Sequence, residues 1–486
     1  MSAVPDLMRI GAINTEMAQD VQTIITDPVV FDQNTCRITL QNIGFLHSLS
    51  RITFQVEAGA LNASNASNAN MTFPAGVGIH SLIERATLMI GGKTVCEVED
   101  FGHFMGYKSM FIDGQINKQR ESVLSGRIMA HEFQPTDVDE SASSYGLDNG
   151  TFPYTTADLF GTTNGWLPVA DGSASATLVN KLGILPNDNL LVRNEPELQV
   201  ALADLFPFLR FNQLPLYMMN EQVSINLVFV PKGDNRRVVR QGVSGAVQEF
   251  NIKEGSVKLI ADYLTFPGEI MAQYQEANKE MNFNYVDYRL TKRTYNGSGA
   301  VPQTKQILNV GGAGRVVNKI FCALANDNQG QDNILNAYTS IAPGTNGSGN
   351  VQVLTTNVRY NDEYLYPIDR VNPALEFHDI VQTEGFVPHI TKAEYNTENC
   401  KNTGGGLTNI ITYNGHSPFA QLNGKFFYQA HRLNKNERVN SRGIELETTY
   451  SELPDLGGAL NYTQRVWIEV LRTATLRNGI FDCYYA

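Results

Sequence analysis

Two glycine-rich stretches have residue types that could bind phosphate groups. Residues 90–94 read IGGKT, and Gly-Lys-Thr also ends a phosphate-binding loop. Such a loop needs another glycine where this chain has Thr87, and it must open a helix whose backbone amides converge on phosphate. Residues typical of strands follow here instead, at 94–96. We therefore predict a hairpin turn at Gly91-Gly92 and no phosphate site.

The second stretch is Gly311-Gly312-Ala313-Gly314, which has the spacing of the first two glycines of a dinucleotide-binding fingerprint. The third glycine of that fingerprint is replaced by Val317, and no strand–helix–strand pattern surrounds it. We expect a turn between two strands.

Residues 327–333 (DNQGQDN) have the residue types of a calcium loop. Their glycine comes too early for an EF-hand, and no glutamate stands at the closing position. No metal site is assigned to them.

The histidines do not form a recognisable site. All eight (47, 80, 103, 131, 378, 389, 416 and 431) lack metal-ligand spacing. His131 and His378 each precede an acidic residue, but neighbours in a strand point to opposite faces. Neither lies beside a serine or cysteine in a nucleophile motif. We interpret all eight as structural or surface residues, and predict no catalytic, cofactor-binding or metal-binding residue, no cofactor and no enzymatic activity.

The composition favours a large protein with wide protein contacts. The 486 residues are 42% hydrophobic, which is enough for two domains with sizeable cores. Charged residues make up only 18%, so few charges would have to lose water when a surface is buried by a partner. The net charge of −12 disfavours a role in coating nucleic acid.

The cysteines and the chain ends indicate a protein made in the cytosol. The five cysteines (36, 96, 322, 400 and 483) are scattered, odd in number and without CxxC spacing, so we expect reduced, buried thiols. The apolar runs are too short to span a bilayer, and the first residues lack the layout of a signal peptide. Arg236, Arg237 and Arg240 have no interleaved aromatic residues and are interpreted as a solvated linker.

Alternating apolar and polar residues predict strands along the chain. The clearest case is 223–229, with Val223, Ile225, Leu227 and Phe229 on one face. Other strands are expected at 37–40, 51–59, 306–310, 319–325, 351–358, 425–433, 443–449 and 464–472. Short strands separated by turn signals, in two series, predict two β-sandwiches.

Long polar stretches separate some of these strands. Residues 62–72 and 134–182 are rich in small polar residues and are predicted to be loops, the second one ordered by its embedded aromatic residues. The segment 1–20 is either a frayed terminus or an arm that docks on a neighbour. The C-terminal residues 481–486 either tie neighbouring subunits together or complete their own sandwich.

Three segments carry a family resemblance. In residues 200–230 an apolar helical segment, Leu-Pro-Leu and an alternating strand follow each other. Residues 80–111 contain a strand, the IGG hairpin and a helical segment, and residues 257–288 contain a strand, a charged helix and another strand. In this order they resemble the double jelly-roll major capsid proteins of eukaryotic large DNA viruses and their virophage and polinton-like relatives. The third segment looks like the opening of the second jelly roll.

The resemblance implies an all-β fold of two tandem eight-stranded jelly-roll sandwiches with short helices and long loop insertions. We expect an N-terminal arm at 1–20, a first jelly roll at 21–231, a linker region at 232–255 and a second jelly roll at 256–486.

The implied function is that of a major capsid protein. Three chains around a three-fold axis would present six sandwiches, hence a pseudo-hexameric capsomer that tiles an icosahedral virion shell. The implied partners are two further copies in a homotrimer, neighbouring capsomers, and penton and minor capsid proteins, without sequence-specific binding of nucleic acid. Whether an internal membrane is also a partner is left open by the resemblance. The protein would reside in the virion capsid after assembly inside the host cell.

Two other classes stay open at this point. A carbohydrate- or receptor-binding β-sandwich, such as a lectin-like or spike protein, needs an aromatic platform, for which Trp166 and the nearby Tyr and Phe residues are the candidates. A jelly-roll enzyme of the cupin type needs a His/Glu metal cluster across two strands, which the scattered histidines do not favour.

Overall fold

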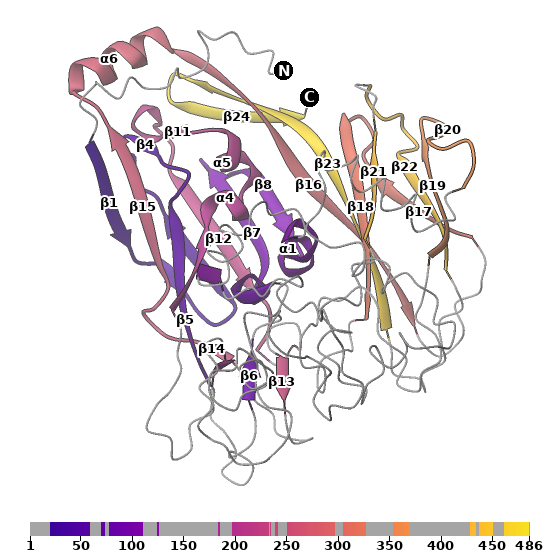
Figure 1. Cartoon of the computed structure of the whole chain (residues 1–486). Coiled ribbons are helices and arrows are strands. Elements are labelled where there is room, and N and C mark those ends of the chain that lie inside the picture. Colours follow the sequence, from indigo (N-terminus) through magenta and orange to yellow (C-terminus); the bar gives the residue numbers. More distant parts are fainter. Residues whose placement is uncertain are drawn as a thin grey trace, which may run out of the picture.

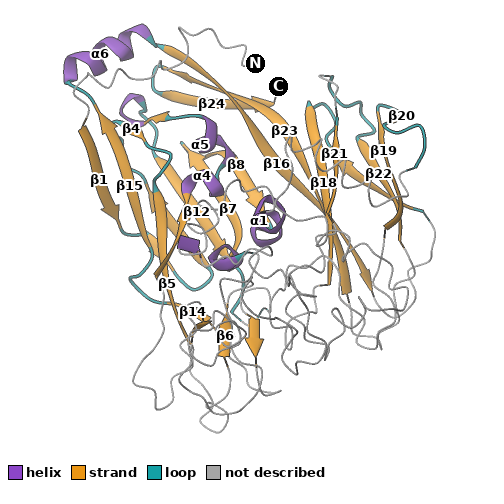
Figure 2. Ribbon diagram, in the orientation of Figure 1, coloured by secondary structure: helices purple, strands orange, loops and turns teal. Residues whose placement is uncertain are grey.

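The protein is built almost entirely from antiparallel strands (Figures 1 and 2). The computed structural model describes residues 20–58, 70–72, 77–109, 124–125, 183–184, 197–232, 234, 239–241, 250–296, 305–326, 353–369, 428–433, 437–450 and 461–485. Among these residues, no helix is long and apolar enough to cross a membrane.

The first sandwich pairs two large sheets. One runs in the order β1 (Asp20–Thr26), β15 (Lys258–Thr265), β5 (Arg51–Ala58) and β10 (Glu197–Ala201), with the short strands β4 (Phe45–Leu46), β11 (Leu214–Pro215) and β14 (Phe250–Ile252) attached. The other runs β2 (Val30–Phe31), β3 (Thr35–Thr39), β12 (Val223–Phe229), β7 (Ile83–Ile90) and β8 (Lys93–Glu99).

The second sandwich repeats this arrangement. One sheet runs β16 (Glu280–Asn296), β23 (Asn461–Arg477), β18 (Val317–Asn326) and β21 (Tyr428–Arg432), and β24 (Ile480–Tyr485) also pairs with β23. The other runs β17 (Gln306–Gly311), β22 (Ile444–Tyr450), β19 (Val353–Tyr360) and β20 (Glu363–Tyr364).

Both halves have the same topology. The main strands of the first half are β1, β3, β5, β7, β8, β10, β12 and β15, and those of the second are β16 to β23. Numbered one to eight within each half, one sheet has the order 1-8-3-6 and the other 2-7-4-5. Eight antiparallel strands divided between two sheets in this order form a jelly roll. The predicted tandem jelly-roll fold is therefore confirmed.

One predicted strand belongs to the other sandwich. Residues 258–265, which the family resemblance predicts at the opening of the second jelly roll, form β15. This strand pairs with β1 and β5 and is the eighth strand of the first sandwich. That expectation is wrong because the order of elements along the chain does not reveal which strands pair with one another. The connection between the sandwiches instead contains α6 (Gly268–Ala277), whose start follows Pro267.

Smaller departures lie in the expected loop and linker. Residues 70–72, expected in a loop, form β6 (Asn70–Thr72), which pairs with β9 (Gly183–Ile184) and with β13 (Val239–Gln241) from the expected linker. The arm 1–20 is described only at Asp20, and residues 134–182 and 327–333 lie outside the described part.

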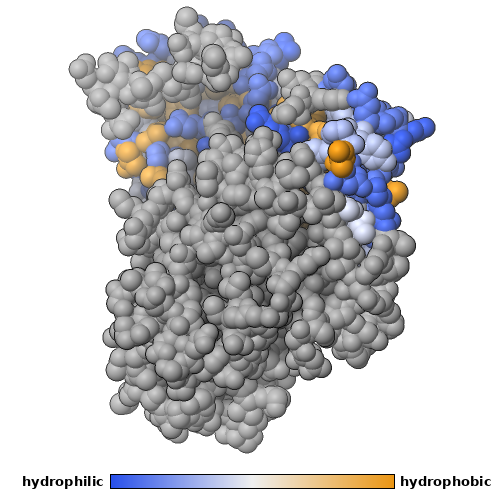
Figure 3. Space-filling model, turned by 45° about the vertical axis from the view of Figure 1, so that its right-hand side comes forward, coloured by the Kyte–Doolittle hydropathy of each residue, from blue (hydrophilic) through white to orange (hydrophobic). Residues whose placement is uncertain are grey.

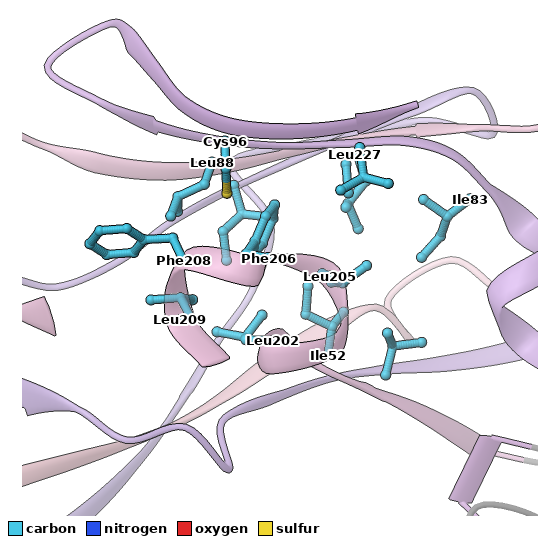
Figure 4. Packing of buried hydrophobic residues seen from close by; sticks show 14 of the residues in the cluster. Ile52, Ile83, Leu88, Cys96, Leu202, Leu205, Phe206, Phe208, Leu209 and Leu227 are labelled. Atoms are coloured by element: carbon cyan, nitrogen blue, oxygen red, sulfur yellow. The ribbon is translucent and has the colours of Figure 1, made fainter. Parts of the chain in front are cut away.

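The predicted helical segment after β10 packs inside the first sandwich. It forms α4 (Leu202–Leu205) and α5 (Pro207–Phe211), which starts at a proline that favours the first helical turn. Phe206 and Phe208 are fully buried, and Phe206 points toward Leu88 and Cys96 of the facing sheet (Figure 4). Each buried phenylalanine stabilises the fold by roughly 1.5–3 kcal/mol through loss of apolar surface to water.

Candidate functional site: the seam between the sandwiches

The glycine motifs form turns, as predicted. Gly91 and Gly92 make the β7–β8 hairpin with φ of +57° and +80°, a backbone that favours glycine. Gly311 to Gly314 connect β17 to β18, with three of the four residues at positive φ.

The described histidines are held by structural contacts. His80 Nδ1 lies 3.1 Å from the Val77 carbonyl oxygen, and His431 Nδ1 lies 2.9 Å from the Tyr366 hydroxyl. His103 Nδ1 lies 2.6 Å from Oδ1 of the buried Asp100. His131, His378, His389 and His416 lie outside the described residues. Within the described ranges, no group of three or more His, Cys, Asp or Glu residues is arranged to hold a metal ion.

The described cysteines are free thiols, and three of the four are buried. Burial raises the pKa of Cys36 and of Cys322 to about 12, so both are protonated at neutral pH. Burial also raises the pKa of Cys96 well above its ordinary value. Protonated, inaccessible thiols are poor nucleophiles, which agrees with a structural role for these three residues.

Among the described residues, several buried polar and charged groups lie where the two sandwiches meet. We call this contact the seam: β8, α5 and α1 (Phe101–Ser109) of the first sandwich against β16, β23 and β24 of the second. Figure 1 shows the long strands β16 and β23 running past β8 and α1 on their way into the second sandwich. The seam therefore fixes how one sandwich is placed on the other.

Strand β8 is the edge of its sheet, and side chains of the second sandwich satisfy its free backbone groups. The Val95 carbonyl accepts hydrogen bonds from the Tyr285 hydroxyl at 2.9 Å and from Arg472 Nη1 at 2.6 Å. The Glu97 amide donates to Asp287 Oδ1 at 3.2 Å. An unpaired edge is a template for unwanted strand pairing, so these contacts also protect β8 from aggregation.

A buried carboxylate binds an arginine, a lysine and a histidine in the seam. Asp100, which directly precedes α1, is 2% exposed. Its Oδ2 lies 2.5 Å from Arg465 Nε and 2.9 Å from Lys292 Nζ, and its Oδ1 lies 2.6 Å from His103 Nδ1. Burial by itself would raise the pKa of Asp100, but Arg465, His103 and Lys292 together hold it well below its usual range.

A second buried carboxylate behaves differently. Asp287 is fully buried, and its Oδ2 lies 3.1 Å from both Arg472 Nη1 and Arg289 Nη2. Burial raises the pKa of Asp287, and the two arginines offset that effect only in part. Asp287 thus pairs with two arginines through Oδ2 and accepts the Glu97 amide of the β8 edge through Oδ1.

Stacked aromatic rings fill the remainder of the seam. Phe321 of β18 stacks on Trp467 of β23 at 5.3 Å between ring centroids and on Tyr107 of α1 at 4.3 Å. Trp467 also donates its indole N–H to the Glu99 carbonyl at 3.2 Å. Trp467 is fully buried, so both faces of β23 are covered by protein.

The C-terminal strand completes its own sheet. Strand β24 pairs with β23, so the second of the two expectations for residues 481–486 holds for the described residues 481–485. Phe481 is fully buried against Phe208 and Phe283, and its carbonyl accepts from Lys93 Nζ at 3.1 Å. The strand thus ties the last residues of the chain to the first sandwich.

The seam joins residues that are far apart in the sequence. Asp100 and Arg465 are separated by 365 positions, and no local pattern pairs them. A signal was nevertheless present: Arg465, Trp467 and Glu469 alternate with Val466, Ile468 and Val470, and a tryptophan on the supposedly wet face of a strand is unusual. The aromatic candidate Trp166 lies outside the described residues.

The chain resembles solved structures along nearly its whole length. A structure of PBCV-1 VP54 fitted into a cryo-EM reconstruction of the virophage Sputnik matches with a TM-score of 0.55 and 10% identity, over 97% of each chain. A cryo-EM structure of the Sputnik virophage matches with a TM-score of 0.54 and 12% identity, over 100% of this chain and 93% of that one. The mavirus major capsid protein matches with a TM-score of 0.50 and 12% identity, over 98% of this chain and 93% of its own.

No protein-family model matches the chain, and no curated protein matches its sequence. The structural likeness is one of fold: the chain has the double jelly-roll fold seen in viral major capsid proteins.

Proposed function

We propose that this protein is the major capsid protein of a DNA virus with an icosahedral shell, and that it acts as a structural subunit without catalysis. The observation that carries the proposal is the full-length match of both jelly rolls to a fold seen in major capsid proteins. The contents of the described seam agree with it, because its buried polar groups bind one another and the β8 edge.

The proposed working unit is a homotrimer. Two similar sandwiches in one chain give six in a trimer, and a six-sided block can tile a flat facet. We place the protein in the virion, where its partners are neighbouring capsomers together with penton and minor capsid proteins, and an internal membrane where the virion has one. Enclosing a genome requires no basic face, which is compatible with a net charge of −12.

We also propose a revised division of the chain. The first jelly roll extends to Thr265 because β15 pairs within it, and the second begins at Glu280. The segment between them, which contains α6, is the connection.

The proposal is tested by the mass and shape of the purified protein. Size exclusion with light scattering should give about three times the chain mass of 53.8 kDa. Negative-stain images should show a hexagonal outline. A stable monomer at all concentrations would contradict the homotrimer, and a defined glycan ligand on an array would favour a carbohydrate-binding protein instead.

A further inference from the structure

Three arginine side chains gather around the ring of Tyr485 at the end of β24. The guanidinium carbon of Arg315 lies 4.2 Å from the ring centroid, that of Arg472 lies 4.8 Å away and that of Arg289 lies 5.9 Å away. They come from three elements: β16 carries Arg289, β23 carries Arg472, and Arg315 lies in the turn between β17 and β18. Like charges repel one another, so such a cluster needs compensating negative charge.

The cluster lies where β24 ends between the two sandwiches (Figure 1). Tyr485 pairs with Arg472 across the β23–β24 ladder, and its ring packs against the hydrophobic core of the second sandwich. Figure 3 shows that the described surface at this end of the molecule is largely hydrophilic, with hydrophobic residues in small separate groups. The ring is thus held between an apolar core and a group of cations.

Asp287 supplies negative charge to two of the three arginines. Its Oδ2 lies 3.1 Å from both Arg289 Nη2 and Arg472 Nη1, and the side chain is fully buried. Arg315 has no such partner. Within the described part of the chain, its guanidinium makes no ion pair and no hydrogen bond, only the ring contact. The three guanidiniums and the one carboxylate that pairs with them leave an excess of two positive charges.

Donor groups of the cluster are also left over. The Nε atoms of Arg289 and Arg472 are buried and have no hydrogen-bond partner among the described residues. The other nitrogens of Arg472 donate to the Val95 and Thr94 carbonyl oxygens, so this side chain is fixed in place. Arg289 Nη2 donates to the Tyr485 hydroxyl at 2.7 Å, which fixes the ring relative to this arginine. Buried donors without acceptors are costly, and an acceptor placed beside them offsets that cost.

We propose that this cluster, Arg289, Arg315, Arg472 and Tyr485, binds a phosphate group and thereby fastens β24 and the β17–β18 turn to β16 and β23. A phosphate group carries about −1.5 to −2 charges at neutral pH, which matches the positive excess. Guanidinium groups suit this ligand because their planar fork donates two parallel hydrogen bonds to its oxygens. The inference concerns a ligand of the single chain and does not depend on assembly.

Binding of inorganic phosphate to the full chain tests the site. Calorimetry in a phosphate-free buffer should show a single phosphate bound per chain. Phosphate should also raise the midpoint of thermal unfolding, because a ligand of the folded state stabilises that state. Sodium chloride at the same ionic strength is the control and should give a smaller rise, because it only screens the charges. Equal rises in the two salts would overturn the proposal.

Arg315→Gln removes the guanidinium that has no partner in the described part of the chain, so the fold should be retained. Its affinity for phosphate should fall roughly tenfold or more, the worth of a hydrogen bond to a charged group. Arg477→Gln is the matched control, because it removes the same charge from β23 but its side chain is 72% exposed and lies 3.9 Å from Glu280. The affinity of the control should change by less than about twofold. Equal losses in both variants would show diffuse attraction without a site.

Tyr485→Leu tests the ring without changing the charge. Loss of the ring releases Arg315 and Arg289, so the affinity for phosphate should fall although all three arginines remain. Circular dichroism checks that the strand content is unchanged. An unchanged affinity would show that the ring does not position the arginines, and the site as described would be wrong.

A second probe separates two sources of the phosphate group. Vesicles of phosphatidylcholine with phosphatidic acid present this group on a lipid headgroup. Co-sedimentation that is lost in Arg315→Gln but kept in Arg477→Gln would support the site and assign it to a headgroup. Binding of inorganic phosphate without co-sedimentation would support the site and assign it to the free ion. If neither probe binds, the inference is wrong, and the proposed capsid function is unaffected.

Discussion

Asp100 is the residue on which the charges of the seam converge. It is almost fully buried and contacts Arg465, Lys292 and His103, which come from three different elements. Removing the carboxylate would leave the buried Arg465 guanidinium without its charge partner, which costs more than the intact pair contributes.

We expect Asp100→Asn to lower the free energy of unfolding by about 3–5 kcal/mol, because Arg465 keeps its buried charge and loses its carboxylate. Asp482→Asn is the control: its carboxylate pairs with Lys93 but is 66% exposed, so the loss should stay below about 1 kcal/mol. Urea unfolding of both variants measures the difference. Equal losses would contradict the role given to Asp100.

The pH dependence of this effect has a defined sign. The pKa of Asp100 lies well below its ordinary value of 3.8, so its ionised form stabilises the folded chain above that pH. As the pH falls below 3.8, the unfolded chain takes up the proton first and the stabilisation is lost progressively. The gap between wild type and Asp100→Asn should therefore be constant above this pH and shrink below it. A gap that persists unchanged in strong acid would show that packing, not charge, carries the effect.

At the scale of elements, the β7–β8 hairpin and the C-terminal strand depend on each other. Glu221 lies beside the hairpin and accepts the Phe481 amide of β24 through Oε2 at 2.7 Å. A Cβ at Gly91 would collide with the Glu221 side chain, whereas a Cβ at Gly92 would meet nothing within 4 Å. Alanine at Gly92 would therefore test backbone strain alone, whereas alanine at Gly91 would test backbone strain together with the Glu221 contact to β24.

We expect Gly92→Ala to cost about 1–2 kcal/mol for the left-handed backbone alone. Gly91→Ala should cost more, because Glu221 must also move and release the Phe481 amide. Thermal unfolding compares the two variants, and hydrogen exchange at Phe481 reports the freed strand. If both variants lose the same stability and Phe481 stays protected, Glu221 does not couple the hairpin to β24.

At the scale of the whole molecule, the two sandwiches share one hydrophobic core. The first core cluster contains residues of both: Leu88 and Phe208 from the first sandwich, and Phe283, Phe321 and Trp467 from the second. A smaller cluster, which includes Val310 and Leu446, lies within the second sandwich alone. A shared core couples the unfolding of the two halves.

We expect the sandwiches to unfold in one transition. Trp166→Phe leaves Trp467 as the only tryptophan of the chain, so its fluorescence then reports the seam. The fluorescence midpoint in denaturant should coincide with the midpoint from circular dichroism. Fluorescence that changes well before the loss of strand signal would show that the seam opens first and that the sandwiches are separate folding units.

Local sequence patterns are sufficient to predict many of the strands and the turns between them. The alternation at 223–229 predicted β12, and Gly91-Gly92 predicted a hairpin, because side chains alternate in any strand and a tight turn needs particular residues. Such signals are local, and they survive whichever strand becomes the partner. With the ordered resemblance of three segments, they were sufficient for the tandem jelly-roll fold.

Which strands pair, and what covers their outer faces, depends on long-range contacts that local patterns do not contain. β15 carries the same alternating pattern in either sandwich, and its pairing with β1 and β5 is fixed by contacts more than 200 residues away. For the same reason Arg465 and Trp467 resemble residues of a wet face and are buried in the seam. A period of two states that a strand has two faces, but the rest of the chain decides whether each face meets water, a core or another jelly roll.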